Sequence, residues 1–368
     1  SDSCFAGTTG YGYDDVGREV LDKVYAQIFC TDAALVRIGF VNGTHALSAA
    51  LFAMLKPGDT LLSATGLPYD TLRNAIGIEG DCHGSLKFYG INYAQVDLKA
   101  DGSPDIGAIK KAAADKSVTA VLIQRSRGYG NRPAFSAEQI GEIARAVKEV
   151  DPSINVMVDN CYGEFTGEHE PTEYGVDLMA GSLIKNPGGG LAPTGGYVVG
   201  KAELVEKAAM RLTTPGIGGE CGATLGNNRL LFQGLFMAPH IVAQALKTAT
   251  FCSAMMSKIG FETSPAPDEV RSDIIQMVTL KSADNMKKFC KGIQSGAPVD
   301  SYVTPEPWQM PGYNCPVIMA AGAFVQGSSI ELSADGPMKE PYIAYMQGGI
   351  TYESGKLGIM MAVNEMLE

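Results

Sequence analysis

The chain has 368 residues, of which 45% are hydrophobic and 19% charged, and its formal net charge is −11. This length exceeds the usual size of one domain, so we expect two lobes. The acidic balance argues against binding to nucleic acids or anionic membranes. No run of about 18 apolar residues predicts a membrane span and no signal peptide heads the chain, so we expect a cytoplasmic protein.

The cysteines and histidines give no pattern of a metal site. None of the eight cysteines forms a CxxC pair, and no group of cysteines and the four histidines has the spacing of metal ligands. Scattered thiols in a large chain are typical of reduced, buried side chains. We therefore expect no bound metal ion.

The first 15 residues are polar, glycine-rich and aromatic, without a clear period. We interpret them as an N-terminal arm that needs another surface to pack on. A helix is predicted over 15–29, where apolar residues recur at helical spacing.

Residues 36–200 alternate between apolar strands and amphipathic helices. Helices are predicted over 43–55, 68–77, 105–115 and 136–150, the last with a capping signal at Ser136 and Gln139. Strands are predicted over 36–41, 59–64, 94–98, 118–126, 154–160, 177–184 and 196–200. This alternation predicts an α/β fold with a mostly parallel sheet covered on both faces.

The pattern changes after residue 200. Helices are predicted over 203–212 and 227–260, the second interrupted at Pro239. Beyond 261, strands are predicted over 274–280, 317–325 and 328–334, and helices over 284–294 and 355–367. We therefore divide the chain into an arm (1–15), a large domain (16–250) and a smaller C-terminal α/β domain (251–368).

Two charged residues stand at the ends of predicted strands. Asp159 ends the strand over 154–160, and Lys185 follows two apolar residues and precedes a glycine-rich loop. Ligands of open α/β sheets bind at the carboxyl ends of strands, where a desolvated lysine suits Schiff-base chemistry. Alternatively, Lys185 is an exposed strand-end lysine and Asp159 caps the following turn.

Three further junctions complete a set. Gly43 and Thr44 open a helix whose N-terminus could bind phosphate, although the glycine could serve the turn alone. Tyr69 lies at the next strand-to-helix junction, and Ser182 precedes Lys185 by three residues. A phosphate cradle, a flat aromatic ring, a carboxylate and an amine on one sheet edge are what pyridoxal 5'-phosphate needs.

On these residues the chain resembles the fold-type I pyridoxal-phosphate enzymes of the cystathionine/methionine γ-lyase group. Within that group it is most similar to the bacterial aluminium-resistance or cystathionine β-lyase-like proteins. The matching stretches are GTTGYGYDDVGRE, VNGTHALSAAL, LPYDTL, IQRSRGYGNRP, VMVDNCYGEF, GSLIKNPGGGLAPTGGYVVG, GATLGNNRLLFQGLFMAPH and YMQGGITYE. The resemblance implies an aspartate aminotransferase-like large domain that binds the cofactor.

The resemblance also implies a role for each matching residue. Lys185 matches the lysine that holds the cofactor as an imine, Asp159 its pyridinium partner, and Tyr69 the tyrosine that stacks on the ring and relays a proton to the leaving group. The phosphate-binding positions are Gly43, Thr44 and Ser182. Tyr11 and Tyr13 lie where the family sends side chains into a neighbouring subunit, which implies a homodimer or homotetramer with shared sites.

The substrate-binding residues depart from the family pattern. The family holds the substrate carboxylate with a small-lobe arginine, but no arginine follows Arg271, and the matching position is Ala344 or Tyr345. Lys339 could replace it as a point charge. The other substrate-facing positions implied by the resemblance are Arg125, Ser126 and Arg127. Arg18 could supply the guanidinium missing from the phosphate site, or could lie on a solvated helix face.

The resemblance implies a carbon–sulfur lyase acting on a cystathionine-, cysteine- or methionine-type amino acid. The reaction would be α-proton abstraction followed by β- or γ-elimination. Two alternatives stay open on the sequence: other pyridoxal-phosphate chemistry, such as transamination, aldol cleavage or racemisation, and a non-catalytic scaffold that retains the fold.

Overall fold

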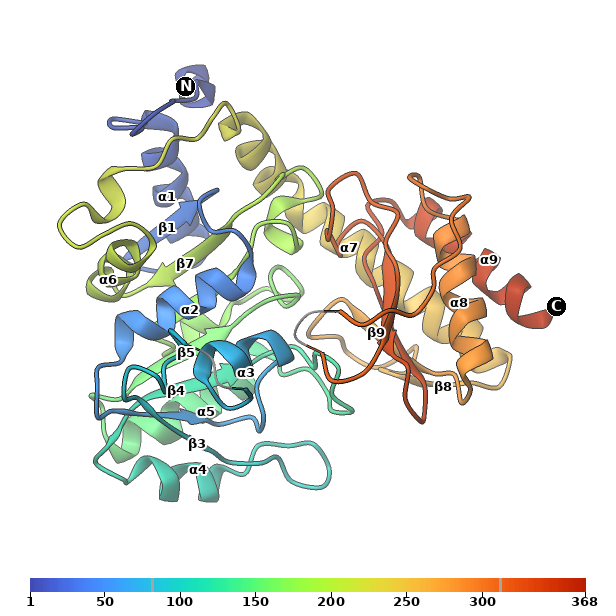
Figure 1. Ribbon diagram of the computed structural model, residues 1–368, viewed down its shortest axis with the longest axis horizontal. Helices are drawn as coiled ribbons and strands as arrows, with labels where there is room; N and C mark the ends of the chain where they lie inside the picture. Colours follow the sequence, from blue (N-terminus) through green and yellow to red (C-terminus); the bar gives the residue numbers. More distant parts are fainter. Residues whose placement is uncertain (81–82, 311–312) are drawn as a thin grey trace.

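Two β-sheets organise the protein, whose computed structural model describes residues 1–80, 83–310 and 313–368. The larger sheet has seven strands and the smaller has five. Figure 1 shows a large lobe and a smaller C-terminal lobe, with helix α7 running between them. The prediction of a large lobe with a mostly parallel sheet and a smaller α/β lobe is confirmed.

The large sheet is parallel except at one end. Its order is β1-β7-β6-β5-β4-β2-β3, and only β7 pairs antiparallel, with β6 and with β1. The strands β4, β5, β6 and β7 are buried along almost their whole length, as their continuous apolar sequences predict. The seven strands are β1 (Ala33–Arg37), β2 (Thr60–Ser63), β3 (Asn92–Gln95), β4 (Val118–Gln124), β5 (Asn155–Asp159), β6 (Leu178–Ser182) and β7 (Gly196–Gly200).

Helices cover both faces of this sheet. One hydrophobic core includes residues of α1, α4 and α5, and another includes residues of α2, α3 and α6. Ser136 and Gln139 form the capping box expected for α5. The helices are α1 (Val16–Ile28), α2 (Gly43–Met54), α3 (Asp70–Ile76), α4 (Ile106–Ala113), α5 (Ala137–Val150) and α6 (Ala202–Leu212), with 3₁₀ turns at Asp2–Phe5, Pro171–Tyr174, Asn186–Gly188 and Gly218–Glu220.

Helix α7 (Asn228–Lys258) passes through Pro239 without a break, so the predicted interruption is wrong. A proline inside a helix costs about 3 kcal/mol. Burial along the helix offsets this cost, because Leu231 and Leu235 belong to a large-lobe core whereas Ala249 and Cys252 belong to the small-lobe core. The domain boundary expected at residue 250 falls within this helix.

The small lobe is an antiparallel sheet backed by two helices. Its strand order is β10-β11-β12-β9-β8, and α8 (Ala283–Ser295) and α9 (Tyr352–Leu367) share its core. The strand predicted over 328–334 is wrong, because β11 begins at Ser333 and the preceding residues form a buried turn. The strands are β8 (Glu262–Ser264), β9 (Ile275–Thr279), β10 (Val317–Ala320), β11 (Ser333–Pro337) and β12 (Ile343–Gln347).

The N-terminal arm packs on its own chain. The rings of Phe5 and Phe232 lie 5.9 Å apart, and the Gly222 amide donates to the Tyr11 carbonyl at 2.9 Å. The surface that the arm was expected to need is therefore supplied by the segment before α7 and by the first turns of that helix.

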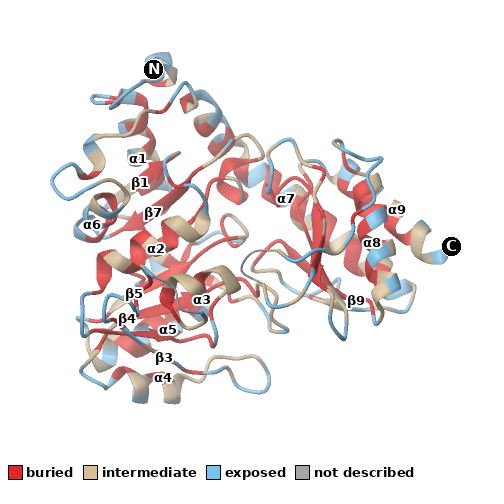
Figure 2. Ribbon diagram, in the orientation of Figure 1, coloured by how far each residue is buried: buried red, intermediate tan, exposed pale blue. Residues whose placement is uncertain are grey.

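Burial is concentrated in the two sheets and in the helix faces that cover them (Figure 2). No helix in the described part of the chain combines the length and the apolar character needed to cross a membrane. The seven described cysteines are free thiols, and Cys82 lies outside the described residues.

Candidate active site

A cleft of about 320 Å³ opens between the two lobes at the carboxyl ends of β4, β5 and β6. Its walls come from the large-lobe junctions and from β10, β11 and β12 of the small lobe. Seven of the sequence-predicted site residues line it together: Gly43, Thr44, Tyr69, Ser126, Asp159, Ser182 and Lys185. Parallel strands bring their carboxyl ends to one edge, which is why residues so distant in sequence converge here.

Lys185 lies just beyond β6 and points its ammonium at an aromatic ring. Its Nζ atom is 3.9 Å from the centroid of the Tyr162 ring. Burial lowers the pKa of Lys185, but the acidic groups around it, beginning with Cys161 and Tyr162 and including Asp159, raise it by more, so the net pKa is above its ordinary value. Without a cofactor, Lys185 is therefore a cation.

Asp159 is the last residue of β5 and is almost fully buried. Burial raises the pKa of its carboxyl above the ordinary value, and the nearby Lys185 ammonium partly offsets this. Its Oδ1 accepts a hydrogen bond from the Cys161 amide at 3.2 Å. A protonated ring nitrogen placed beside this carboxylate would compensate the cost of burying it.

The N-terminus of α2 also lines the cleft. Asn42 caps this helix by accepting from the His45 amide at 2.8 Å. A Cβ atom on Gly43 would lie 3.2 Å from the Ser182 Cβ, so glycine keeps the approach open. The Ser182 hydroxyl is fully buried and finds no hydrogen-bond partner among the described residues. This orphaned donor beside a helix N-terminus fits a phosphate group.

Tyr69 precedes α3 and is engaged with a second tyrosine from the small-lobe side. Its hydroxyl lies 2.6 Å from the Tyr313 hydroxyl, and its ring centroid lies 6.2 Å from that of Tyr129. Burial raises the pKa of Tyr69 well above its ordinary value, so the phenol keeps its proton. Sequence reasoning missed Tyr129 and Tyr313; only the RGYG stretch around Tyr129, already matched to the family, could have indicated the former.

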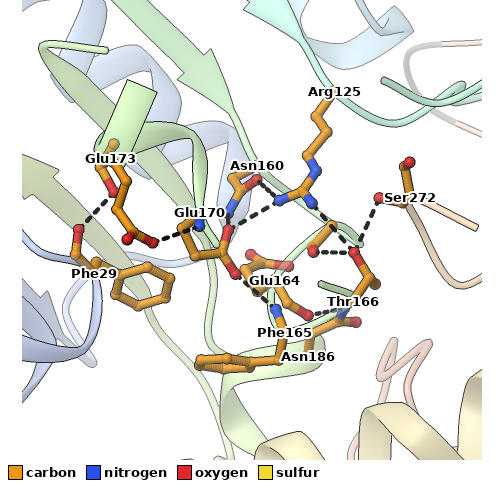
Figure 3. Close-up of polar contacts among 12 residues, drawn as sticks. Phe29, Arg125, Asn160, Glu164, Phe165, Thr166, Glu170, Glu173, Asn186 and Ser272 are labelled. Carbon is orange, nitrogen blue, oxygen red and sulfur yellow. Dashed lines mark hydrogen bonds and ion pairs between the residues drawn. The ribbon is translucent and has the colours of Figure 1, made fainter. Parts of the chain in front are cut away.

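The prediction that Arg125 faces the substrate is wrong. Its side chain is buried and turned into an ion pair with Glu170 at 2.9 Å. The guanidinium also donates to Asn160 Oδ1 at 2.8 Å and to Thr166 Oγ1 at 3.2 Å (Figure 3). The buried Glu170 carboxylate therefore holds this arginine, which is not among the residues that line the cleft.

The other residues expected to face the substrate divide between two clefts. The Ser126 hydroxyl, in the main cleft, donates to Asp273 at 2.8 Å. Arg127 and Lys339 line an adjoining cleft that also contains Arg132. The Arg127 guanidinium donates to the carbonyl and the hydroxyl of Ser264, each at 3.2 Å.

Arg18 fits neither of its two expected positions. Its side chain is buried, and it donates to the Gly222 carbonyl at 2.9 Å and the Glu220 carbonyl at 3.1 Å. It is therefore neither solvated nor free to bind phosphate. Tyr11 and Tyr13 are 76% and 55% exposed. Neither is among the described residues that line the cleft.

Glu164, which sequence reasoning missed, is a buried acid behind Lys185. Its Oε1 accepts from the Tyr197 hydroxyl at 2.8 Å. Figure 3 shows its other contact, in which the Glu164 backbone carbonyl accepts from Asn186 Nδ2 at 2.9 Å. Burial raises the pKa of Glu164 to about 8. The side chain is therefore a neutral acid at pH 7.

Glu164→Gln is expected to remove a pH dependence of stability. The folded protein holds the Glu164 proton up to about pH 8, whereas the unfolded chain releases it near 4.5, so the free energy of unfolding falls as pH rises between these values. Denaturant unfolding at pH 5 and pH 9 measures this effect. Between these two pH values the free energy of unfolding of the parent should fall by a few kcal/mol more than that of the variant, about 1.4 kcal/mol for each unit of pKa shift. Parallel pH profiles for the two proteins would contradict this role.

The described residues were compared with the ligand sets that hold metal ions in proteins. Throughout residues 1–80, 83–310 and 313–368, no three His, Cys, Asp or Glu side chains group as metal ligands do. The cleft instead combines an amine, a buried carboxylate, a neutral phenol and an anion cradle at the edge of a mostly parallel sheet. This fold and this set of residues fit a pyridoxal-phosphate-dependent enzyme of fold type I.

The family follows from the sequence profile of methionine gamma-lyase, which matches residues 1–367. The chain belongs to this family, whose cofactor is pyridoxal 5'-phosphate. A curated relative is an uncharacterized protein, YnbB, of Bacillus subtilis, which is 51% identical over 369 residues, covering 100% of this chain and 87% of the relative. L-methionine gamma-lyase of Pseudomonas putida is 26% identical over 239 residues, covering 63% of this chain and 53% of that protein.

Solved structures agree with this assignment. A carbon-sulfur lyase involved in aluminium resistance from Clostridium novyi is 56% identical and superposes with a TM-score of 0.95, over 99% of this chain and 85% of that one. The pyridoxal-5'-phosphate-dependent protein YhfS from Escherichia coli, 19% identical, shares the fold with a TM-score of 0.64, over 97% of this chain and 88% of that one.

Proposed function

We propose that the protein is a pyridoxal-phosphate-dependent carbon–sulfur lyase that acts on a sulfur amino acid by α-proton abstraction and β- or γ-elimination. The observation that carries this proposal is the convergence of Lys185, Asp159 and the orphaned Ser182 hydroxyl in one cleft. The similarity to the carbon-sulfur lyase of Clostridium novyi supports it.

Each residue takes a role from its position. Bound pyridoxal phosphate supplies an electron sink that stabilises the charge left when the substrate loses its α-proton. Lys185 would bind the cofactor's aldehyde and, once displaced by the substrate amine, remove that proton. Asp159 would hold the ring nitrogen protonated, while Gly43, Thr44 and Ser182 would bind the phosphate.

Tyr69 would protonate the leaving thiolate. A general acid must hold its proton until the transition state, and burial keeps the Tyr69 phenol neutral. Its place on the cleft wall suits both of its proposed roles, stacking on the cofactor ring and protonating the leaving group.

The substrate carboxylate would be held from the adjoining cleft. Arg127, Arg132 and Lys339 line that cleft, which shares Tyr69 and Tyr129 with the main one. Burial lowers the pKa of Arg132 to about 10, so an anion bound there would relieve the cost of burying its charge. Ser126, on the wall of the main cleft, would contact the substrate directly.

We also propose a cytoplasmic homodimer or homotetramer. The exposed rings of Tyr11 and Tyr13 lie 5.8 Å apart on the surface, a position from which they would complete the phosphate site of a second copy.

The assay that tests the function uses the cofactor-loaded protein with cystathionine, cysteine and methionine, with and without a 2-oxo acid. A lyase is expected to release a thiol or sulfide, a 2-oxo acid and ammonia from at least one of them. Amino-group exchange with the added 2-oxo acid and no sulfur product would instead indicate a transferase. A protein that binds the cofactor but gives no product would indicate a scaffold.

A further inference from the structure

An acidic side chain, Asp335, lies on the small-lobe wall of the active-site cleft. It belongs to β11 and is 8% exposed. Its Oδ2 accepts a hydrogen bond from Gln347 Nε2 at 3.2 Å. Its Oδ1 is buried and has no hydrogen-bond partner among the described residues. A buried carboxylate oxygen without a partner is costly, so it indicates a missing ligand group.

The described residues that line the cleft include more acidic than basic side chains. Among the described residues that line the cleft, Lys185 is the one cation, whereas Asp159 and Asp335 are two acids. In the proposed function Lys185 bonds to the cofactor and Asp159 pairs with the ring nitrogen. Asp335 is then left without a positive partner, and a buried charge needs one.

Three tyrosines line the cleft together with this carboxylate. They are Tyr69, Tyr129 and Tyr313, and the negative charge of Asp335 raises the pKa of each of them. The ring centroids of Tyr129 and Tyr313 lie 5.7 Å apart. Aromatic faces beside a carboxylate attract an organic cation by its charge and by the ring quadrupole.

Asp335 is ionised at the pH of an ordinary assay. Burial raises the pKa of its carboxyl only to about 6, since the nearby Tyr129 hydroxyl, the Gln347 hydrogen bond and the Lys185 charge oppose the effect of burial. Above pH 7 the side chain is therefore mostly a carboxylate.

We propose that Asp335 and the tyrosines around it bind an ammonium group carried by the leaving-group end of the substrate. The enzyme would thereby prefer sulfur amino acids that have a second amine beyond the sulfur. This inference rests on the proposed function. In the proposed function the α-amine displaces Lys185 and bonds to the cofactor, so it is not available to pair with Asp335.

The test compares two substrates of equal length on the cofactor-loaded protein, S-(2-aminoethyl)cysteine and S-propylcysteine. The parent is expected to show a kcat/KM about 10- to 100-fold higher for the amine, the range of a hydrogen bond to a charged group. In Asp335→Asn this ratio should fall to near one, with the rate for S-propylcysteine largely retained. Asp335→Ser serves as a second variant, and Asp101→Asn, an exposed acid, controls for net charge.

Binding provides a readout that does not depend on turnover. Lysine and 2-aminoheptanoate have the same length but no sulfur to eliminate, and their affinities can be measured from changes in the cofactor spectrum. The parent should bind lysine at least tenfold more tightly, and Asp335→Asn should lose that preference.

Two results would overturn the inference. One is a parent without preference for the amine in either assay. The other is an Asp335→Asn variant in which kcat/KM and affinity fall equally for charged and neutral compounds. Asp335 would then bind the α-amine or stabilise the fold. A lysine preference that depends on Asp335, in a protein that eliminates no sulfur compound, would uphold this site and refute the lyase function instead.

Discussion

Replacing Lys185 with alanine is expected to abolish the visible absorption band of the bound cofactor and to lower turnover by at least about 10²- to 10⁴-fold. Lys185 is the one amine among the described residues that line the cleft. Without it, neither the covalent attachment of the cofactor nor the base for the α-proton is available. The measurement is an absorption spectrum of the purified protein, followed by the elimination assay.

A control lysine separates this loss from a general effect of removing positive charge. Lys287 is about half exposed and pairs with Glu306 at 3.1 Å. Lys287→Ala should keep the absorption band and the activity of the parent. A band that survives in Lys185→Ala would show that the cofactor is attached elsewhere.

Arg125→Met is expected to destabilise the fold by about 3–5 kcal/mol. The Arg125 and Glu170 side chains are only 2% and 8% exposed, so the substitution leaves a buried carboxylate without its cation. Because Arg125 also holds Asn160, directly after Asp159, we expect weaker cofactor binding as well. Denaturant unfolding and a cofactor titration measure the two effects.

The double variant Arg125→Met/Glu170→Gln should recover part of the lost stability, since it removes the uncompensated charge. Lys110→Met provides the matched control, because Lys110 and Glu149 form an exposed pair at 2.5 Å. That variant should lose less than about 1 kcal/mol. Equal losses in Arg125→Met and Lys110→Met would show that the buried pair has no special role.

Strand ends and their chemistry were predictable because they depend on local sequence. Apolar runs followed by Asp159 or by Lys185 predict buried parallel strands with polar residues at their carboxyl ends. The fold class then places those residues on one edge of the sheet. Site residues predicted from such strand ends and junctions all line the cleft, whereas the chemical role of each stays a prediction.

Arginine positions were not predictable in the same way. Arg125 and Arg18 are both buried and engaged by partners distant in sequence, Glu170 in one case and the carbonyls of Glu220 and Gly222 in the other. A long side chain reaches several alternative partners, and only packing decides among them. The unbroken path of α7 through Pro239 has the same origin, because contacts with two lobes outweigh a local preference.

The sequence by itself determined the alternating α/β architecture and the amine, carboxylate and anion cradle at the sheet edge, because hydrophobic period and turn residues act over short distances. Only the tertiary structure decided what the small lobe adds opposite them. Asp335, Gln347 and Tyr313 meet the large-lobe residues across the cleft, and their places follow from the docking of the two lobes along α7. No local pattern encodes that docking, because it depends on the burial of surfaces far apart in the chain.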